Sequence, residues 1–211
     1  MDMRKAQNTI IAASAIAIGA MLVASIIEGY RYSYATSIAC LLLLMIPAIC
    51  MAKDVVLLPW PVVLCIGVAL SLHCLGVLMD WYTLIHWWDK LTHLVSGIAV
   101  ASLAALALIV FIVSSSKTIV PLAWVPFLII ISVLTMEGIW EIFEFSLDTI
   151  IGTYTQHSLA DTMGDITTNT ISGVIAGLGV AYYMSKASLD CLVESMRVDR
   201  IVNWVRHQFI D

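Results

Sequence analysis

Acidic and histidine residues recur at helical spacing in the C-terminal two-thirds of an otherwise strongly apolar chain. They form three groups, which are Asp89 with His93; Glu137, Glu141 and Glu144; and Asp161, Asp165 and Asn169. Residues three, four or seven positions apart share one face of an α-helix, so each group predicts a polar stripe. An ionised carboxylate at the centre of a bilayer costs roughly 2.5–3.5 kcal/mol. The stripes therefore need a partner, a proton or water, which makes them the candidate functional residues.

Carboxylates that converge with an imidazole can bind a divalent cation. Carboxylate-rich sites suit Mg²⁺, Mn²⁺ or Ca²⁺, and a histidine ligand favours Zn²⁺ or iron. The candidate metal ligands are Asp89, His93, Glu141, Glu144, Asp161 and Asp165. The same groups can instead exchange protons as acid–base pairs or relays. The candidate catalytic residues of that kind are Asp89, His93, Glu141, Glu144 and Asp165. The sequence leaves the cofactor unknown, and a divalent cation and a proton relay both fit.

Four further residues are expected in the same pocket. They are Glu137, Asn169, Lys90 and His157. Lys90 is the candidate counter-ion of Asp89, and His157 lies close in sequence to the acidic residues of the last group. The alternative is that the acidic residues are solvated groups that cap helix ends, where aspartates near a helix start interact favourably with the helix dipole. Helix caps do not require repetition at i, i+4 and i+7, so we prefer the converging pocket.

The elements that carry these residues are predicted to be membrane-spanning helices. Hydrophobic residues make up 61% of the chain and charged residues 12%, against about 45–50% and about 25% in soluble domains. Six segments are long and apolar enough to cross a bilayer, which takes about 20 residues. They are 9–27, 34–52, 55–78, 94–114, 119–139 and 166–185. Because the runs are continuous and do not alternate, they predict helices and not barrel strands. We therefore expect an all-α six-helix transmembrane domain over 1–186 and a cytoplasmic amphipathic tail over 187–211.

The distribution of basic residues predicts the orientation of these spans. If the six spans alternate, eight Lys and Arg residues fall on one side and only Arg31 and Lys90 on the other. Such a bias places the basic side in the cytoplasm. We expect both termini there, the polar stripes near the outer leaflet, and a location in a prokaryotic inner membrane.

The sixth predicted span contains a GxxxG pattern at Gly173 and Gly177. Two small residues one turn apart allow another helix backbone to approach closely. We expect this pattern to serve packing inside the monomer more often than dimerisation, so it does not decide the oligomeric state.

Three sequence blocks resemble the YjdF-like inner-membrane proteins. They are Trp88–Gly97 with its Asp-Lys-x-x-His core, Trp140–Phe145 with its Glu-x-x-Glu pattern, and Asp161–Asp165 before the last span. Asp165, Asn169 and Gly173 are also similar to the Asp-x-x-x-Asn-x-x-x-Gly helix of VanZ-like proteins. The first resemblance implies a multispanning architecture without an established activity. The second implies, by analogy only, a role in the cell envelope.

Three functions are consistent with these features. The first is a metal-dependent or acid–base enzyme, or a binding protein, for a lipid-linked or amphiphilic substrate. The second is a small proton- or cation-coupled transporter, which would need a polar path across the membrane. The third is a non-catalytic scaffold whose acidic residues lock helices together. We expect membrane lipid as a partner and no nucleic acid, while the sequence leaves enzymatic activity, substrate and oligomeric state open.

Overall fold

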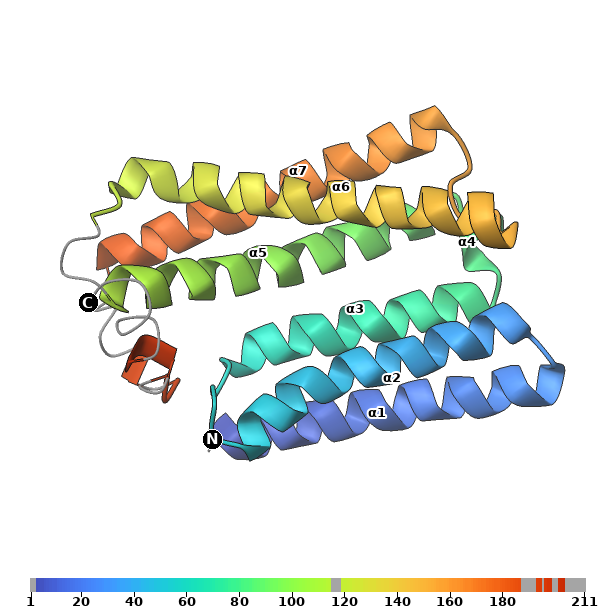
Figure 1. The fold of residues 1–211 in the computed structure, drawn as a ribbon, viewed down its shortest axis with the longest axis horizontal. Coiled ribbons are helices and arrows are strands. Elements are labelled where there is room, and N and C mark those ends of the chain that lie inside the picture. The colour runs from blue at the N-terminus through green and yellow to red at the C-terminus, as the bar shows by residue number, and fades with distance from the viewer. Residues whose placement is uncertain (1–2, 115–118, 187–192, 195, 199–200, 204–211) are drawn as a thin grey trace. The chain divides into compact units, whose positions relative to one another are not determined.

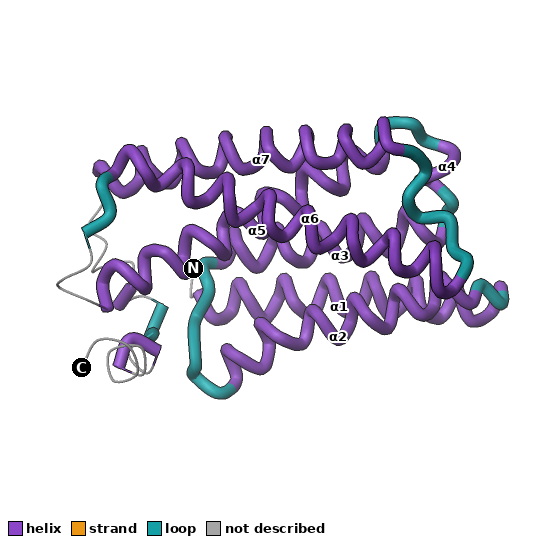
Figure 2. Tube along the Cα trace, turned by 45° about the horizontal axis from the view of Figure 1, so that its top comes forward, coloured by secondary structure: helices purple, strands orange, loops and turns teal. Residues whose placement is uncertain are grey.

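The structure, a computed structural model, describes residues 3–114, 119–186, 193–194, 196–198 and 201–203. Within these ranges the chain forms helices and connecting loops and no strand, which confirms the predicted all-helical class (Figure 2). The helices are α1 (Met3–Glu28), α2 (Arg31–Ala52), α3 (Trp60–Leu78), α4 (Trp81–Leu84), α5 (Trp88–Ser114), the 3₁₀ turn η1 (Leu122–Trp124), α6 (Val125–Ile151) and α7 (Leu159–Lys186).

The described residues divide into two compact units. The first unit contains α1 to α4 and the last turns of α5, from Ile109 onward. Its core is formed by Ile18, Cys40, Leu44 and Cys74, which come from α1, α2 and α3. Gly29 has a φ of +73° and turns the chain tightly between α1 and α2. This unit is therefore a set of apolar helices joined by short connections.

The second unit contains the remainder of α5 together with η1, α6 and α7. We call its two ends the polar half (89–100, 134–151 and 159–172) and the apolar half (101–108, 125–133 and 173–186). The core of the apolar half consists of Ala101, Ala105, Val125, Ile129 and Val133. All the candidate residues named above lie in the second unit.

Helices α6 and α7 form an antiparallel hairpin (Figure 1). A Cβ atom at Gly177 would lie 2.9 Å from the Cα of Pro126, and one at Gly173 would lie 3.3 Å from the Cα of Ile130. Both glycines of the GxxxG pattern thus let α7 approach the α6 backbone closely. The expectation that this pattern packs helices within one chain is confirmed.

Among the described residues, five helical segments are long and apolar enough to cross a membrane, and α7 is not among them. Helix α7 nevertheless forms over 28 residues and includes the predicted span 166–185. Three helices extend beyond the predicted spans at the polar ends, since α5 begins at Trp88, α6 continues to Ile151 and α7 begins at Leu159. The polar stripes therefore lie within helices, as the spacing of their residues predicted. Most of the predicted tail helix, 187–211, lies outside the described residues.

Candidate functional site

The ammonium group of Lys90 links three carboxylates from two helices. Its Nζ lies 2.8 Å from Asp89 Oδ2, 2.8 Å from Asp161 Oδ1 and 2.7 Å from Asp165 Oδ1. The backbone has made room for this side chain, because a Cβ at Gly164 would lie 2.9 Å from Lys90 Cε. Lys90 thus joins the start of α5 to the start of α7 and supplies positive charge to the carboxylates around it.

His93 lies one turn further along α5 and contacts acidic residues on all three helices. Its Nε2 is 3.4 Å from Asp89 Oδ1 and 3.6 Å from Asp165 Oδ1, while its Nδ1 is 3.2 Å from Glu137 Oε1. His93 is 8% exposed, Glu137 6% and Asp165 3%. Because so little of these groups reaches the surface, their charges act on one another with little screening by water.

Asn169 lies between His93 and Glu137. Its Nδ2 donates a hydrogen bond to Glu137 Oε2 at 2.6 Å and lies 3.0 Å from His93 Nδ1. An amide nitrogen can only donate, so when the imidazole is neutral this arrangement makes His93 Nδ1 the acceptor and puts the imidazole proton on Nε2. That N–H then points toward the carboxylates of Asp89 and Asp165. Glu137 Oε1 is buried and receives no hydrogen bond.

Small side chains allow α5 and α7 to pack closely beside these polar groups. A Cβ at Gly97 would clash with Asn169 Oδ1 and would lie 2.8 Å from the Cβ of Ser172. Ser172 in turn donates from its hydroxyl to the carbonyl oxygen of Leu94 at 3.0 Å. Gly97, on the same face of α5 as Asp89 and His93, therefore fixes the distance at which Asn169 meets the imidazole.

Glu141, one turn after Glu137, has a different set of partners. Its Oε2 accepts hydrogen bonds from Gln156 Nε2 and from Thr162 Oγ1, both at 2.8 Å. The side chain is 7% exposed, and Oε1 is buried without a hydrogen-bond partner. Glu144 follows on the same helix and accepts a hydrogen bond from Trp140 Nε1 at 2.9 Å.

The loop that brings Gln156 to Glu141 is held by Asp148. The Asp148 carboxylate accepts hydrogen bonds from the hydroxyl of Thr153, from the backbone N–H and hydroxyl of Thr155, and from the backbone N–H of Gln156, at 2.7–2.9 Å. The helix ends at Gly152, whose φ of +79° reverses the chain direction. Asp148 is thus a structural residue that orders the α6–α7 connection.

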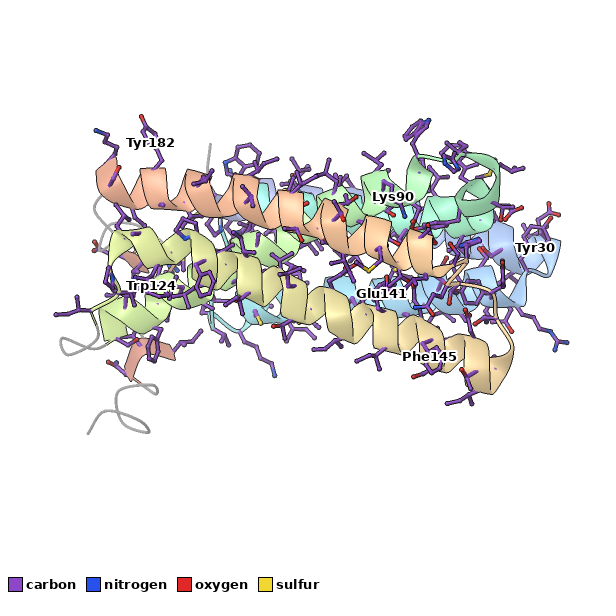
Figure 3. The ribbon with its side chains drawn as sticks, turned by 90° about the horizontal axis from the view of Figure 1, so that it is seen from above. Tyr30, Lys90, Trp124, Glu141, Phe145 and Tyr182 are labelled. Atoms are coloured by element: carbon purple, nitrogen blue, oxygen red, sulfur yellow. The ribbon has the colours of Figure 1, made fainter. Side chains whose placement is uncertain are left out.

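The structure brings together most residues that the sequence identified. The polar stripes of α5, α6 and α7 converge in the polar half, and the predicted pairing of Lys90 with Asp89 is present. The imidazole of His157 is more peripheral: its Nδ1 lies 3.4 Å from Asp161 Oδ2, and its ring packs against the ring of Tyr154. Figure 3 shows Lys90 and Glu141 in the same half of the unit as Phe145, and Trp124 and Tyr182 in the other half.

Sequence reasoning missed four residues that shape the site. They are Gln156, Thr162, Gly164 and Ser172. Gly164 follows Asp161 by three residues, and Ser172 follows Asn169 by three residues. Helical periodicity could therefore have predicted that each pair shares a face of α7. Gln156 lies in a loop, and no periodic pattern in the sequence signals its position.

One group of three residues is close enough to hold a metal ion. Ligand atoms of Asp89, His93 and Asp165 all lie within 4.8 Å of one another. However, Lys90 Nζ lies within 2.8 Å of both aspartates. A dication on the same carboxylates would be repelled by this ammonium group at short range. The arrangement found here is therefore better suited to holding and exchanging protons than to holding a dication.

Comparison with known proteins places this site in a family without assigning it a reaction. No curated protein and no solved structure matches the chain. The family described as "Predicted membrane protein (DUF2238)" matches residues 10–186, which include all three polar stripes. The match supports a multispanning integral membrane protein. It does not support assignment to the YjdF-like or the VanZ-like proteins, which the sequence blocks suggested. The chain belongs to this family of uncharacterised membrane proteins.

Proposed function

We propose that the polar half is a membrane-embedded acid–base centre, with His93 as its proton-exchanging group, acting on an amphiphilic or lipid-linked substrate. The observation that carries the proposal is that both protonation states of His93 have partners. With one proton on Nε2, the ring faces Asp89 and Asp165. A second proton would go to Nδ1, where Glu137 Oε1 lies 3.2 Å away and receives no other hydrogen bond.

Each neighbour of His93 then has a defined part in proton exchange. Glu137 accepts from the protonated ring, and Asn169 donates to the neutral one. Lys90 lies within ion-pair distance of Asp89 and Asp165, so these carboxylates keep one shared counter-ion when the ring loses its proton. A histidine flanked by carboxylates and held in position is the usual arrangement of a general acid or base.

An amphiphilic substrate is suggested by the surface around the centre. The side of α6 that faces away from Glu137 and Glu141 exposes large apolar side chains: Ile139, Ile142 and Phe143 are 49–67% exposed. In a bilayer such a face contacts lipid tails. A molecule with an apolar part could therefore approach the polar half from within the membrane. The resemblance to VanZ-like proteins adds, by analogy, a role in the cell envelope.

The same proposal includes α7 as a sixth span, with both termini in the cytoplasm of a prokaryotic cell. At 1.5 Å per residue, the 28 residues of α7 extend about 42 Å, enough to cross the hydrocarbon layer. The excess of Lys and Arg on one side supports this orientation, which puts the polar half near the outer leaflet. The buried core of the apolar half is formed by apolar side chains, which does not favour a polar path, so we rank a transporter lower.

Replacement of the chromosomal gene by a His93→Gln variant tests the proposal. Lipid extracts should show at least one amphiphile whose level depends on the wild-type gene and is lost with the variant, because glutamine cannot exchange a proton. Glu28→Gln is the matched control, since it removes a carboxylate at the exposed end of α1. If His93→Gln protein is folded and its lipid extract equals that of the wild type, His93 is not the working group.

A further inference from the structure

The carboxylate of Glu141 has one buried oxygen without a hydrogen bond: Oε2 accepts two hydrogen bonds, and Oε1 accepts none. Glu137 Oε1 also accepts none, but it lies 3.2 Å from His93 Nδ1. Lys90 forms ion pairs with Asp89, Asp161 and Asp165, and His93 lies beside Glu137. Among the described residues, neither basic group lies within ion-pair distance of Glu141 or Glu144. A buried ionised carboxylate with one empty oxygen and no counter-ion is costly, so something has to complete it.

Oε2 already accepts from the Thr162 hydroxyl and the Gln156 amide, whereas Oε1 has no hydrogen-bond partner among the described residues. A cation at Oε1 would supply both the missing charge and the missing contact.

Side chains next to Glu141 offer further oxygen atoms. Glu144 lies three residues after Glu141, on the same face of α6, and its Oε1 accepts a hydrogen bond from Trp140. The hydroxyl oxygen of Thr162 and the amide oxygen of Gln156 belong to side chains that already touch Glu141. Asp148 fixes the backbone of Gln156 and so holds that side chain in place. Two carboxylates with neutral oxygen donors suit a hard divalent cation such as Ca²⁺, Mg²⁺ or Mn²⁺.

We propose that Glu141 and Glu144, with Thr162 and Gln156, form a binding site for one hard divalent cation, distinct from the Lys90–His93 centre. The site does not depend on the acid–base function proposed above. It lies on α6, the α6–α7 connection and the first turn of α7, whereas His93 and Lys90 come from α5. The ion would neutralise the acidic side of the polar half that Lys90 does not reach.

Equilibrium dialysis of the purified full chain in detergent, with ⁴⁵Ca²⁺ and separately with Mn²⁺, tests this site. We expect one ion per wild-type chain and at least a tenfold weaker affinity for Glu141→Gln and for Glu144→Gln. Thr162→Val should weaken binding by a smaller factor, because it removes a neutral ligand. Glu28→Gln should bind as the wild type does, since its carboxylate is in the other unit.

A His93→Gln variant separates this inference from the proposed function. Unchanged ion binding by that variant, with loss of binding by Glu141→Gln, supports two distinct sites. Loss of binding by His93→Gln and Asp165→Asn, with Glu141→Gln unaffected, would move the ion to the Asp89–His93–Asp165 group and overturn the inference. No binding of either ion by the wild type at millimolar concentration would also overturn it. Circular dichroism and size-exclusion profiles of each variant show whether a loss reflects misfolding.

Discussion

The polar half and the apolar half are built from the same three helices, yet different contacts hold them together. In the apolar half, Ala101, Ala105 and Ile129 are almost fully buried against one another and their neighbours. In the polar half, α5 and α7 are joined through Lys90 and through the contact of His93 with Asn169. In both halves a glycine allows a neighbouring helix to approach closely. Gly97 does so in the polar half and Gly177 in the apolar half.

The difference shows which contacts define the geometry of each half. Apolar packing is non-directional and tolerates substitutions of similar volume. Removing one partner of a buried hydrogen bond or ion pair destabilises the folded state, because the other partner stays buried without compensation. The apolar half can therefore act as the scaffold, while the polar half depends on a few named atoms. Three sets of substitutions test this contrast, in order of decreasing effect.

The largest effect is expected from Lys90→Met. It leaves Asp89, Asp161 and Asp165 without their shared cation. Removing one partner of a buried ion pair costs about 3–5 kcal/mol, and we expect about 3 kcal/mol because the side chain of Lys90 is 33% exposed. Thermal unfolding in detergent measures it. Combining Lys90→Met with Asp165→Asn should recover part of the loss.

Lys186→Met is the matched control, because it makes the same change at the exposed end of α7 in the apolar half. It should change the unfolding midpoint very little. Equal losses from Lys90→Met and Lys186→Met would contradict the assignment of Lys90 as the counter-ion of the polar half.

An intermediate effect is expected from one added methyl group in each half. Gly97→Ala and Gly177→Ala both force neighbouring atoms apart, at a cost of about 1–3 kcal/mol. Only Gly97→Ala displaces Asn169, so only this variant should alter the histidine titration measured by ¹⁵N NMR. Gly179→Ala is the control, since a Cβ there meets nothing within 4 Å. A changed histidine titration in Gly177→Ala would show that the halves are not independent.

The smallest effect is expected from Ser172→Ala. It removes the hydroxyl that donates to the Leu94 carbonyl between α7 and α5, a hydrogen bond worth about 0.5–1.5 kcal/mol. Thr167→Ala, whose hydroxyl bonds only the Met163 carbonyl of its own helix, should cost less. The difference between the two unfolding midpoints isolates the contact between helices. A zero difference would mean that this hydrogen bond adds nothing to the packing of α5 on α7.

Much of the candidate site could be predicted because helical periodicity is a local property. Asp89 and His93, or Asp165 and Asn169, share a face in any α-helix, and their need for partners in an apolar environment predicts that the faces converge. Helix ends were harder to predict at the polar side. There an apolar run stops, but the helix continues, since its backbone hydrogen bonds do not depend on apolar side chains and its charged groups find partners such as Lys90.

The partners of Glu141 could not be predicted. Gln156 reaches it because Asp148 orders the α6–α7 connection, and that arrangement depends on the folded path of a loop. Thr162 lies next to Asp161 in sequence, but its hydroxyl donates to Glu141, whereas Asp161 pairs with Lys90. Such contacts depend on tertiary structure, and no spacing rule within one helix encodes them.

The polar start of α7 has a consequence for how the chain enters the membrane. Helix α7 is not among the five described segments that are apolar enough to span a membrane, and its first three turns carry Asp161, Asp165 and Asn169. The cost of moving aspartates into lipid falls when a cation and hydrogen-bond partners are already in place. Because α5 and α6 are synthesised before α7, Lys90 and Glu137 are present when α7 leaves the ribosome. The α5–α6 pair would thus serve as the template on which α7 inserts, and the order of the helices along the chain becomes part of the assembly pathway.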